Sequence, residues 1–211
     1  MDEQHRLTQQ RLEKLEQLEE RGVAPFPYGF TRSHRIAEIL ERGEAMAREK
    51  TVVRVAGRMM SKRRHGKTAF AHLEDQDGRL QIYVRRDAVG EEAYEAFKLL
   101  DVGDVVGVEG AMMLTRTGEL TVEVQKIELL TKSLRPLPEK WHGLTDKEIR
   151  YRQRYLDLVM NPEVRASFVR RSQVIQTIRE VLVEEGFLEV CLLYTSPSPR
   201  DRTRSRMPSS A

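Results

Sequence analysis

The pattern of apolar and polar residues divides the chain into helical segments near both ends and a β-rich middle. Residues 2–21 and 34–49 carry leucine or isoleucine at helical spacing among charged side chains, which predicts two amphipathic helices. From Thr51 to Thr131 the alternation has period two, which is typical of strands with one buried face. Turn residues separate five predicted strands, at 51–61, 67–74, 79–86, 104–114 and 119–130, and a predicted helix at 91–100 lies between the third and the fourth.

The order of these elements points to one fold. Three strands, a helix and two further strands are the order of the five-stranded OB-fold barrel. The predicted class is therefore α+β and mostly β, with N-terminal helices, an OB-fold barrel and a helical segment after it. Strands 2 and 3 of such a barrel, with loops 1–2 and 4–5, form its binding face.

Two further helices are predicted after the barrel. Thr145-x-x-Glu148 resembles a capping box and predicts a helix to about Met160. Asn161-Pro162 predicts the start of a second helix, which Gly186 ends. Phe187 to Val190 then reads as the start of a strand. The predicted organisation is a helical segment at 1–50, the OB-fold domain at 51–133, a linker at 134–144, a further domain start at 145–190 and a tail at 191–211.

Strand alternation selects the residues of the binding face. Ala69, Ala71, Leu73, Leu80, Ile82 and Val84 are expected inside the barrel, whereas Phe70, His72, Gln81 and Tyr83 are expected outside, together with Arg54 and Arg58 from strand 1. An exposed phenylalanine among polar neighbours is suited to stacking on a nucleobase. A glutamine amide offers a donor and an acceptor to a base edge.

The two loops of this face carry charge. The predicted loop 61–67 contains Lys62, Arg63, Arg64 and Lys67, which would meet a phosphate backbone or form a solvated basic hairpin. Glu119 follows the turn at 115–118. Its carboxylate would accept hydrogen bonds from a base, or it is an ordinary surface residue.

Composition adds mainly exclusions. The single Cys191 excludes a disulfide framework, and no apolar run approaches the roughly 20 residues of a membrane span. We therefore predict a soluble, cytoplasmic protein without membrane contact. No phosphate-binding glycine loop occurs, and the five histidines lack metal-ligand spacing. The arginine-rich stretch 150–158 fits either a charged interface or a solvated helix face.

The tail differs from the rest of the chain. Residues 191–211 are rich in Ser, Thr and Pro and hold four arginines, whereas residues 1–190 contain equal numbers of acidic and basic side chains. The pI of 9.0 is thus a property of the tail and not evidence for nucleic-acid binding. The tail reads either as a foreign or frame-shifted end, expected to be disordered, or as a natural Arg/Ser arm that binds RNA.

Ordered blocks along residues 1–190 resemble bacterial-type lysyl-tRNA synthetases. They are Val55-Ala-Gly-Arg-Met-Met60, Gly66-Lys67, Phe70-Ala-His-Leu-Glu-Asp75, Leu80-Gln-Ile-Tyr-Val84, Thr117-Gly-Glu-Leu120, Leu134-Arg-Pro-Leu-Pro138, His142-Gly-Leu144 and Arg150-Tyr-Arg-Gln-Arg-Tyr-Leu-Asp-Leu158. The resemblance implies an OB-fold domain that binds the anticodon loop of tRNA(Lys), and a class II catalytic domain that uses ATP and Mg²⁺ in a homodimer. In that family, the positions matching Arg58, Phe70, Gln81 and Glu119 contact the anticodon.

The resemblance stops after Val190, inside the first class II signature. The later signatures, which carry the ATP-clamping arginines and the metal-binding carboxylates, are absent. We therefore expect an N-terminal fragment of a lysine–tRNA ligase that binds no cofactor and lacks catalytic activity. The alternatives are a free-standing OB-fold RNA-binding module and a sibling ligase for Asp or Asn, which the Arg150–Leu158 block disfavours.

Overall fold

The computed structural model describes residues 3–138 and 144–190. The chain forms two units, Met1–Leu137 and Pro138–Ala211, which we describe separately. The tail at 191–211 and the predicted linker residues 139–143 lie outside the described residues.

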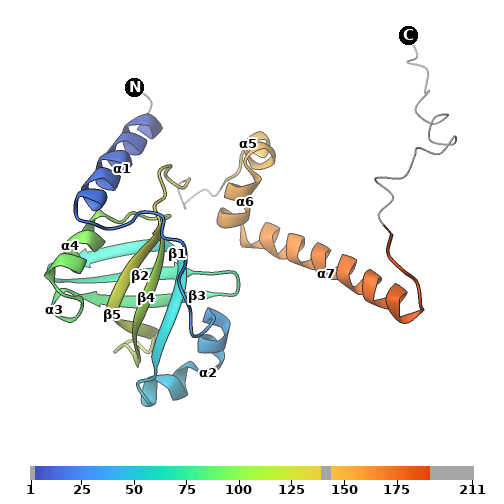
Figure 1. Cartoon of the computed structure of the whole chain (residues 1–211), viewed down its shortest axis with the longest axis horizontal. Helices are drawn as coiled ribbons and strands as arrows, with labels where there is room; N and C mark the ends of the chain where they lie inside the picture. The colour runs from blue at the N-terminus through green and yellow to red at the C-terminus, as the bar shows by residue number, and fades with distance from the viewer. Residues whose placement is uncertain (1–2, 139–143, 191–211) are drawn as a thin grey trace, which may run out of the picture. The chain divides into compact units, whose positions relative to one another are not determined.

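Five strands form the first unit's sheet, and their pairing closes it into a barrel (Figure 1). The strands are β1 (Val52–His65), β2 (Thr68–Glu74), β3 (Arg79–Arg85), β4 (Val105–Leu114) and β5 (Leu120–Thr131). Their order around the barrel is β1-β2-β3-β5-β4, and β1 pairs with β4 to complete the ring. The β3–β5 pair is parallel and the others are antiparallel. The predicted OB fold is confirmed.

The barrel interior is filled by the alternate residues that the sequence pattern selected. Ala69, Ala71 and Leu73 of β2 and Leu80, Ile82 and Val84 of β3 are all at most 1% exposed. Val53, Val55, Val106, Val108, Met112, Val122 and Val124 complete the core from the other strands. Because β-branched and other aliphatic side chains pack well on a pleated surface, burial of this face supplies most of the stabilisation.

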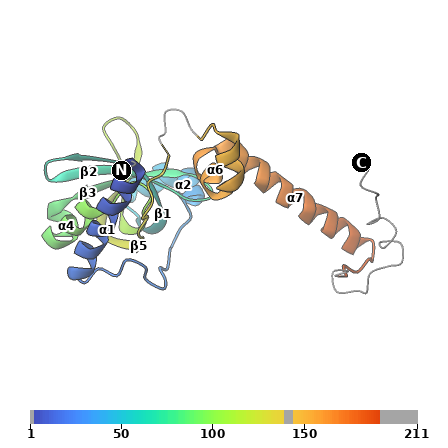
Figure 2. The same ribbon diagram turned by 90° about the horizontal axis from the view of Figure 1, so that it is seen from above.

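Helices cover the two ends of the barrel (Figures 1 and 2). Helix α2 (Ile36–Arg48) lies at the end that holds the β2–β3 turn, where Leu40 approaches Gly78. A helical turn, α3 (Arg86–Val89), leads into α4 (Glu91–Leu99), which buries Tyr94 and Phe97 at the opposite end. Helix α1 (Glu3–Glu20) contacts α4 and buries Leu18.

A polar cluster joins α1 to the exit of the barrel. The Lys132 side chain, fully buried, donates to Asp101 Oδ2 at 2.7 Å and to Asp104 Oδ2 at 2.8 Å. From α1, Lys14 pairs with Asp101, and Arg11 donates to the carbonyls of Val102, Ser133 and Arg135. The cluster therefore fixes where the chain leaves β5.

Strand β1 contains a β-bulge that changes which of its side chains face outward. Met59 pairs with Leu73, and Ser61 pairs with His72, so the register between the two strands shifts at Met60. Both methionines are consequently buried. Beyond the bulge the strand continues to His65, and residues 61–65 are strand rather than the predicted loop. The β1–β2 connection is the short turn at Gly66 and Lys67.

The described part of the second unit is helical. It contains α5 (Lys147–Arg152), α6 (Arg154–Met160) and α7 (Pro162–Glu184), so the single helix predicted up to Met160 is interrupted at Gln153. Asp146, not Thr145, caps α5, because its carboxylate accepts from the backbone of Glu148 and Ile149. Residues 187–190 form no strand, since no partner strand is present among the described residues.

In the arginine-rich stretch 150–158, Arg150 and Arg154 bond to a buried carboxylate of the same unit, whereas Tyr151, Arg152 and Tyr155 are exposed. Asp157 is fully buried and accepts from Arg150 Nε at 2.8 Å, from Arg154, and from Asn161 Nδ2 at 2.6 Å. Burial alone would raise the pKa of Asp157, but the bonds from Asn161 and the two arginines lower it. Neither an external interface nor a solvated face is therefore needed to explain Arg150 and Arg154.

Candidate nucleic-acid interface

A hollow of about 630 Å³ lies on the outer surface of the barrel, across β1, β2, β3 and the β4–β5 loop. We call this surface the Phe70 face. Its lining residues are Ser61, Arg63, His65, Phe70, His72, Gln81, Tyr83, Met113, Thr115, Arg116, Thr117 and Glu119. The predicted binding strands and the β4–β5 loop thus meet in one place.

An aromatic pair stands in this hollow. Phe70 of β2 and Tyr83 of β3 are register partners, and their rings stack with centroids 4.6 Å apart and planes 24° from parallel. Both are half-buried, and the pair sits in a cross-strand arrangement that stabilises a sheet. The sheet therefore holds Phe70 in a defined orientation with part of its ring in solvent.

Gln81 and Glu119 form a hydrogen-bonded pair next to the aromatic rings. Gln81 Nε2 donates to Glu119 Oε2 at 2.7 Å, and Gln81 Oε1 accepts from Thr121 Oγ1 at 2.7 Å. These two bonds fix the orientation of the amide. Gln81 is only 9% exposed, so the prediction of an exposed glutamine is wrong: the side chain is covered because Glu119 and Thr121 bond to both ends of its amide.

His72 holds the other oxygen of the same carboxylate. Its Nε2 lies 3.0 Å from Glu119 Oε1, and its Nδ1 lies 2.7 Å from Ser61 Oγ. The Glu119 backbone is anchored as well, because its N–H donates to Thr115 Oγ1 and its carbonyl accepts from the Thr115 N–H. Glu119 nevertheless keeps about half of its side chain exposed.

The cations around the Phe70 face are Arg63, Arg116 and Lys67, all exposed; the first two line the hollow and Lys67 lies in the β1–β2 turn. Lys62 does not belong to them. Because the bulge at Met60 shifts the alternation, Lys62 pairs with the inward-facing Ala71 and points toward the end of α4. Its ammonium donates to the carbonyls of Phe97, Lys98 and Leu100 at 2.6, 3.2 and 2.6 Å.

The buried position of Lys62 lowers the pKa of its side chain. Burial lowers the pKa of the Lys62 ammonium to about 7, and the negative charge of Asp101 only partly opposes this shift. The side chain also lies over the Phe97 ring, 4.4 Å from its centroid. Lys62 is thus part of the packing between β1 and α4, and the prediction that places it at a phosphate backbone is wrong.

Arg58 lies apart from the hollow. It precedes the bulge, pairs in register with Glu74, and donates from Nη1 to the Gly103 carbonyl at 2.7 Å. The predicted site residues therefore separate into a group on or beside the Phe70 face, comprising Arg63, Lys67, Phe70, His72, Gln81 and Glu119, and two residues engaged elsewhere, Arg58 and Lys62.

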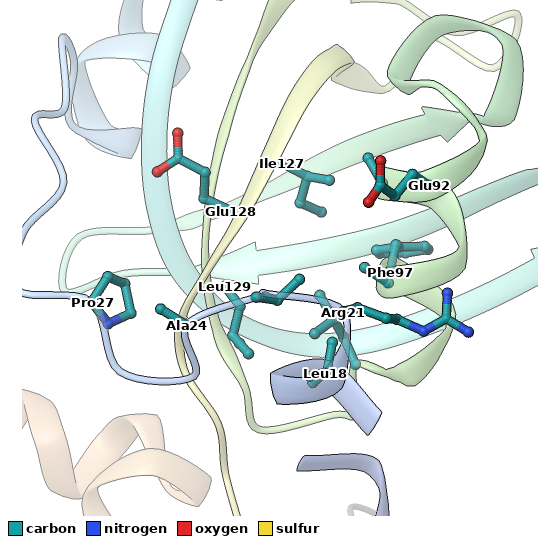
Figure 3. Close-up of a pocket in the computed structure, with 13 residues that line it drawn as sticks. Leu18, Arg21, Ala24, Pro27, Glu92, Phe97, Ile127, Glu128 and Leu129 are labelled. Carbon is teal, nitrogen blue, oxygen red and sulfur yellow. The ribbon is translucent and has the colours of Figure 1, made fainter. Parts of the chain in front are cut away.

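A second hollow, of about 390 Å³, lies between α1, α4 and β5 (Figure 3). Its lining is mainly aliphatic, including Leu18, Ile127 and Leu129, while Arg21 and Glu92 supply charge. It lacks the stacked rings and the hydrogen-bonded network of the Phe70 face, so it is the weaker candidate for a nucleobase.

Two family models match the chain. Residues 53–130 match the OB-fold nucleic acid binding domain, and residues 146–202 match the class II tRNA synthetases for D, K and N. Relatives include the lysine–tRNA ligases of Carboxydothermus hydrogenoformans, 52% identical over 89% of the chain, Enterococcus faecalis, 54% over 85%, and Bacillus subtilis, 48% over 86%.

The chain is thus similar to lysine–tRNA ligases at about 50% identity over most of its own length. The matches span 38%, 37% and 38% of the length of these three lysine–tRNA ligases. Only part of the class II catalytic region of the family is therefore present in the chain. In the described residues, no helix is long and apolar enough to cross a bilayer.

Met113 and Arg116 of the Phe70 face, and Thr121 behind it, were not among the predicted site residues. Thr121 fixes the amide of Gln81, Met113 lines the hollow, and Arg116 adds a cation from the β4–β5 loop. Arg116 stands in the turn before Glu119, so the turn signal could have marked it. Thr121 alternates as an ordinary strand residue, and no local pattern distinguishes it.

Proposed function

We propose that the Phe70 face binds the anticodon loop of a lysine tRNA. The observation that carries this proposal is the stacked Phe70–Tyr83 pair beside the hydrogen-bonded Gln81–Glu119 pair. An unpaired RNA base offers a π-face for stacking and an edge for hydrogen bonding, and this face offers partners for both. The similarity to lysine–tRNA ligases supports a tRNA as the RNA.

Each part of the face has a role in this proposal. Phe70 stacks on one base, and the carboxylate of Glu119, held by the amide of Gln81, reads the edge of a base. The exposed side chains of Arg63, Lys67 and Arg116 attract the phosphates, a contribution that is independent of sequence. A carboxylate accepts from the ring N–H of uridine, whereas cytidine presents an acceptor at that position, so a uridine-rich loop is preferred.

Replacing Phe70 with alanine tests the proposal. Because base–aromatic stacking is worth about 1–3 kcal/mol, Phe70→Ala should weaken binding of an RNA hairpin with a uridine-rich loop by roughly 5- to 150-fold. Fluorescence anisotropy with labelled hairpins measures this. Tyr28→Ala, which removes a fully exposed aromatic ring from the α1–α2 connection, should leave binding unchanged.

A second variant separates base recognition from charge. Arg63→Ala should weaken all hairpins alike and lower the salt slope of binding by about one. If the original protein and Phe70→Ala bind uridine-rich and cytidine-rich hairpins equally well, the assignment of the Phe70 face is wrong.

We further propose that a protein with these domains and the full length of the matched ligases joins lysine to its tRNA. The reaction would use ATP and Mg²⁺, in the cytoplasm and in a homodimer. The similarity to lysine–tRNA ligases supports this reaction. The exposed apolar side chains along α7, such as Ile175, Ile178 and Leu182, support a partner subunit. Among the described residues, no group of three or more His, Cys, Asp or Glu side chains that could hold a metal ion is found.

The 211-residue chain should consequently show no lysine-dependent exchange of pyrophosphate into ATP. Adenylate formation needs preorganised cations on the phosphates and carboxylates for the metal. The described residues of the second unit supply three helices and no sheet to carry such groups. If the purified chain, free of host synthetase, exchanges pyrophosphate above background, this prediction is wrong. A complete lysine–tRNA ligase serves as the positive control.

A further inference from the structure

The carboxylate of Glu119 is held at both oxygens before any RNA is bound. Gln81 bonds to Oε2 and His72 bonds to Oε1. Gln81 is buried and is itself fixed by Thr121. His72 lies at the edge of the network, about a quarter exposed, and is the contact through which the outer side of Glu119 is fixed.

The hydrogen bonds assign a tautomer to His72. A carboxylate only accepts, so Nε2 must carry a hydrogen to bond with Glu119 Oε1. In the neutral ring Nδ1 then has a lone pair, and the hydroxyl of Ser61, 2.7 Å away, donates to it. Ser61 Oγ in turn lies 3.5 Å from Arg79 Nη2. The bulge at Met60 is what places Ser61 opposite His72 in register.

We propose that His72 is a positioning residue for base recognition: it fixes the carboxylate of Glu119 in the orientation that meets the base, and Ser61 keeps the imidazole in the donating tautomer. This inference rests on the proposed binding of an anticodon loop by the Phe70 face. It gives His72 a role different from a direct contact with RNA, because the histidine acts through Glu119.

The role follows from the number of acceptor positions on a carboxylate. Two oxygens provide about four lone-pair positions, of which Gln81 and His72 occupy two. The remaining positions face outward on the exposed half of the side chain and accept from a base N–H. Without His72, Glu119 can rotate toward solvent or toward Arg116, which also lines the hollow. Discrimination between bases then falls, whereas phosphate attraction stays.

Three substitutions at position 72 distinguish this role from simple packing. The amide nitrogen of glutamine occupies about the place of imidazole Nε2, and that of asparagine about the place of Nδ1. His72→Gln therefore restores the donor to Glu119, His72→Asn restores only a partner for Ser61, and His72→Ala restores neither. Circular dichroism and thermal unfolding identify any variant that fails to fold.

The measured quantity is the ratio of affinities for a uridine-loop hairpin and the matched cytidine-loop hairpin. We expect His72→Ala and His72→Asn to lower this ratio about five-fold, the factor equivalent to one net hydrogen bond of about 1 kcal/mol, and His72→Gln to keep it. Ser61→Ala, which removes the tautomer-setting hydroxyl, should lower the ratio by a smaller factor. Cytidine-loop affinity should change little in all four variants.

The outcomes separate this inference from the proposed function. If the original protein discriminates between the hairpins and His72→Ala discriminates equally well, the positioning role is wrong while anticodon binding stands. If Asn restores the ratio and Gln does not, His72 acts through Ser61 and the inference is also wrong. If the original protein itself does not discriminate, the proposed function fails first.

Discussion

Lys132→Met should destabilise the barrel unit by about 3–5 kcal/mol, the range found when one partner of a buried ion pair is removed. The Lys132 side chain is fully buried, and its ammonium is within 2.8 Å of both Asp101 and Asp104. Methionine fills similar volume but leaves the buried carboxylate of Asp104 without its cation. The polar cluster that ties α1 to the end of β5 then loses its centre.

Urea unfolding followed by circular dichroism measures this effect. Lys126→Met is the matched control on β5, because Lys126 is largely exposed and pairs only loosely with Glu109, at 3.6 Å. Its effect should stay within about 0.5 kcal/mol. The double variant Lys132→Met/Asp104→Asn should recover part of the loss, since one buried charge is removed. A loss below 1 kcal/mol in Lys132→Met alone would show that the buried pair is not needed.

Lys62 should make the stability of the barrel unit rise with pH above neutrality. The folded state lowers the pKa of Lys62 to about 7, mainly through burial, whereas a lysine in an unfolded chain titrates near 10.4. Between these values the unfolded chain binds a proton that the folded chain does not, so raising the pH favours folding. The penalty for burying the charge is present below pH 7 and disappears toward pH 10.

The expected size is about 1.4 kcal/mol per pH unit at most, or roughly 2–3 kcal/mol between pH 7 and pH 9. The measurement is the free energy of unfolding of the original protein minus that of Lys62→Met at each pH, which cancels the titration of all other groups. Lys67→Met, at the exposed β1–β2 turn, should give a difference independent of pH. If the difference in the free energy of unfolding between the original protein and Lys62→Met does not change with pH, the three carbonyls and the Phe97 ring compensate in full for the cost of burying the charge.

The barrel could be predicted from sequence because its strands each bury one face. In β2 and β3, every apolar residue at alternate positions proved to be inside, and the Gly-containing turns fell between strands as expected. A local period of two carries this information directly. The same argument explains why the aromatic and polar residues of the Phe70 face could be predicted to face outward.

Two errors share a different physical cause, which is contact between different strands of the sheet. The bulge at Met60 turns Lys62 inward, and nothing in residues 51–67 alone marks an extra residue on one strand. Gln81 is covered only because Glu119 and Thr121, about 40 positions later, bond to it. The break at Gln153 is a third error, and it is local: Gln153 lies between Arg150 and Arg154, whose side chains both bond to the buried Asp157.

The bulge at Met60 also determines what would be needed to transfer the proposed base recognition to another barrel. Strand β1 contributes to two different surfaces. Before Met60, the outward residue Arg58 bonds to the Gly103 carbonyl; after Met60, the outward residues Ser61 and Arg63 line the Phe70 face. A graft that copied the outward residues but left β1 regular would present Lys62 in place of Ser61 and Arg63. Met60 is buried, but because the register of β1 shifts there, it determines which side chains line the proposed recognition surface.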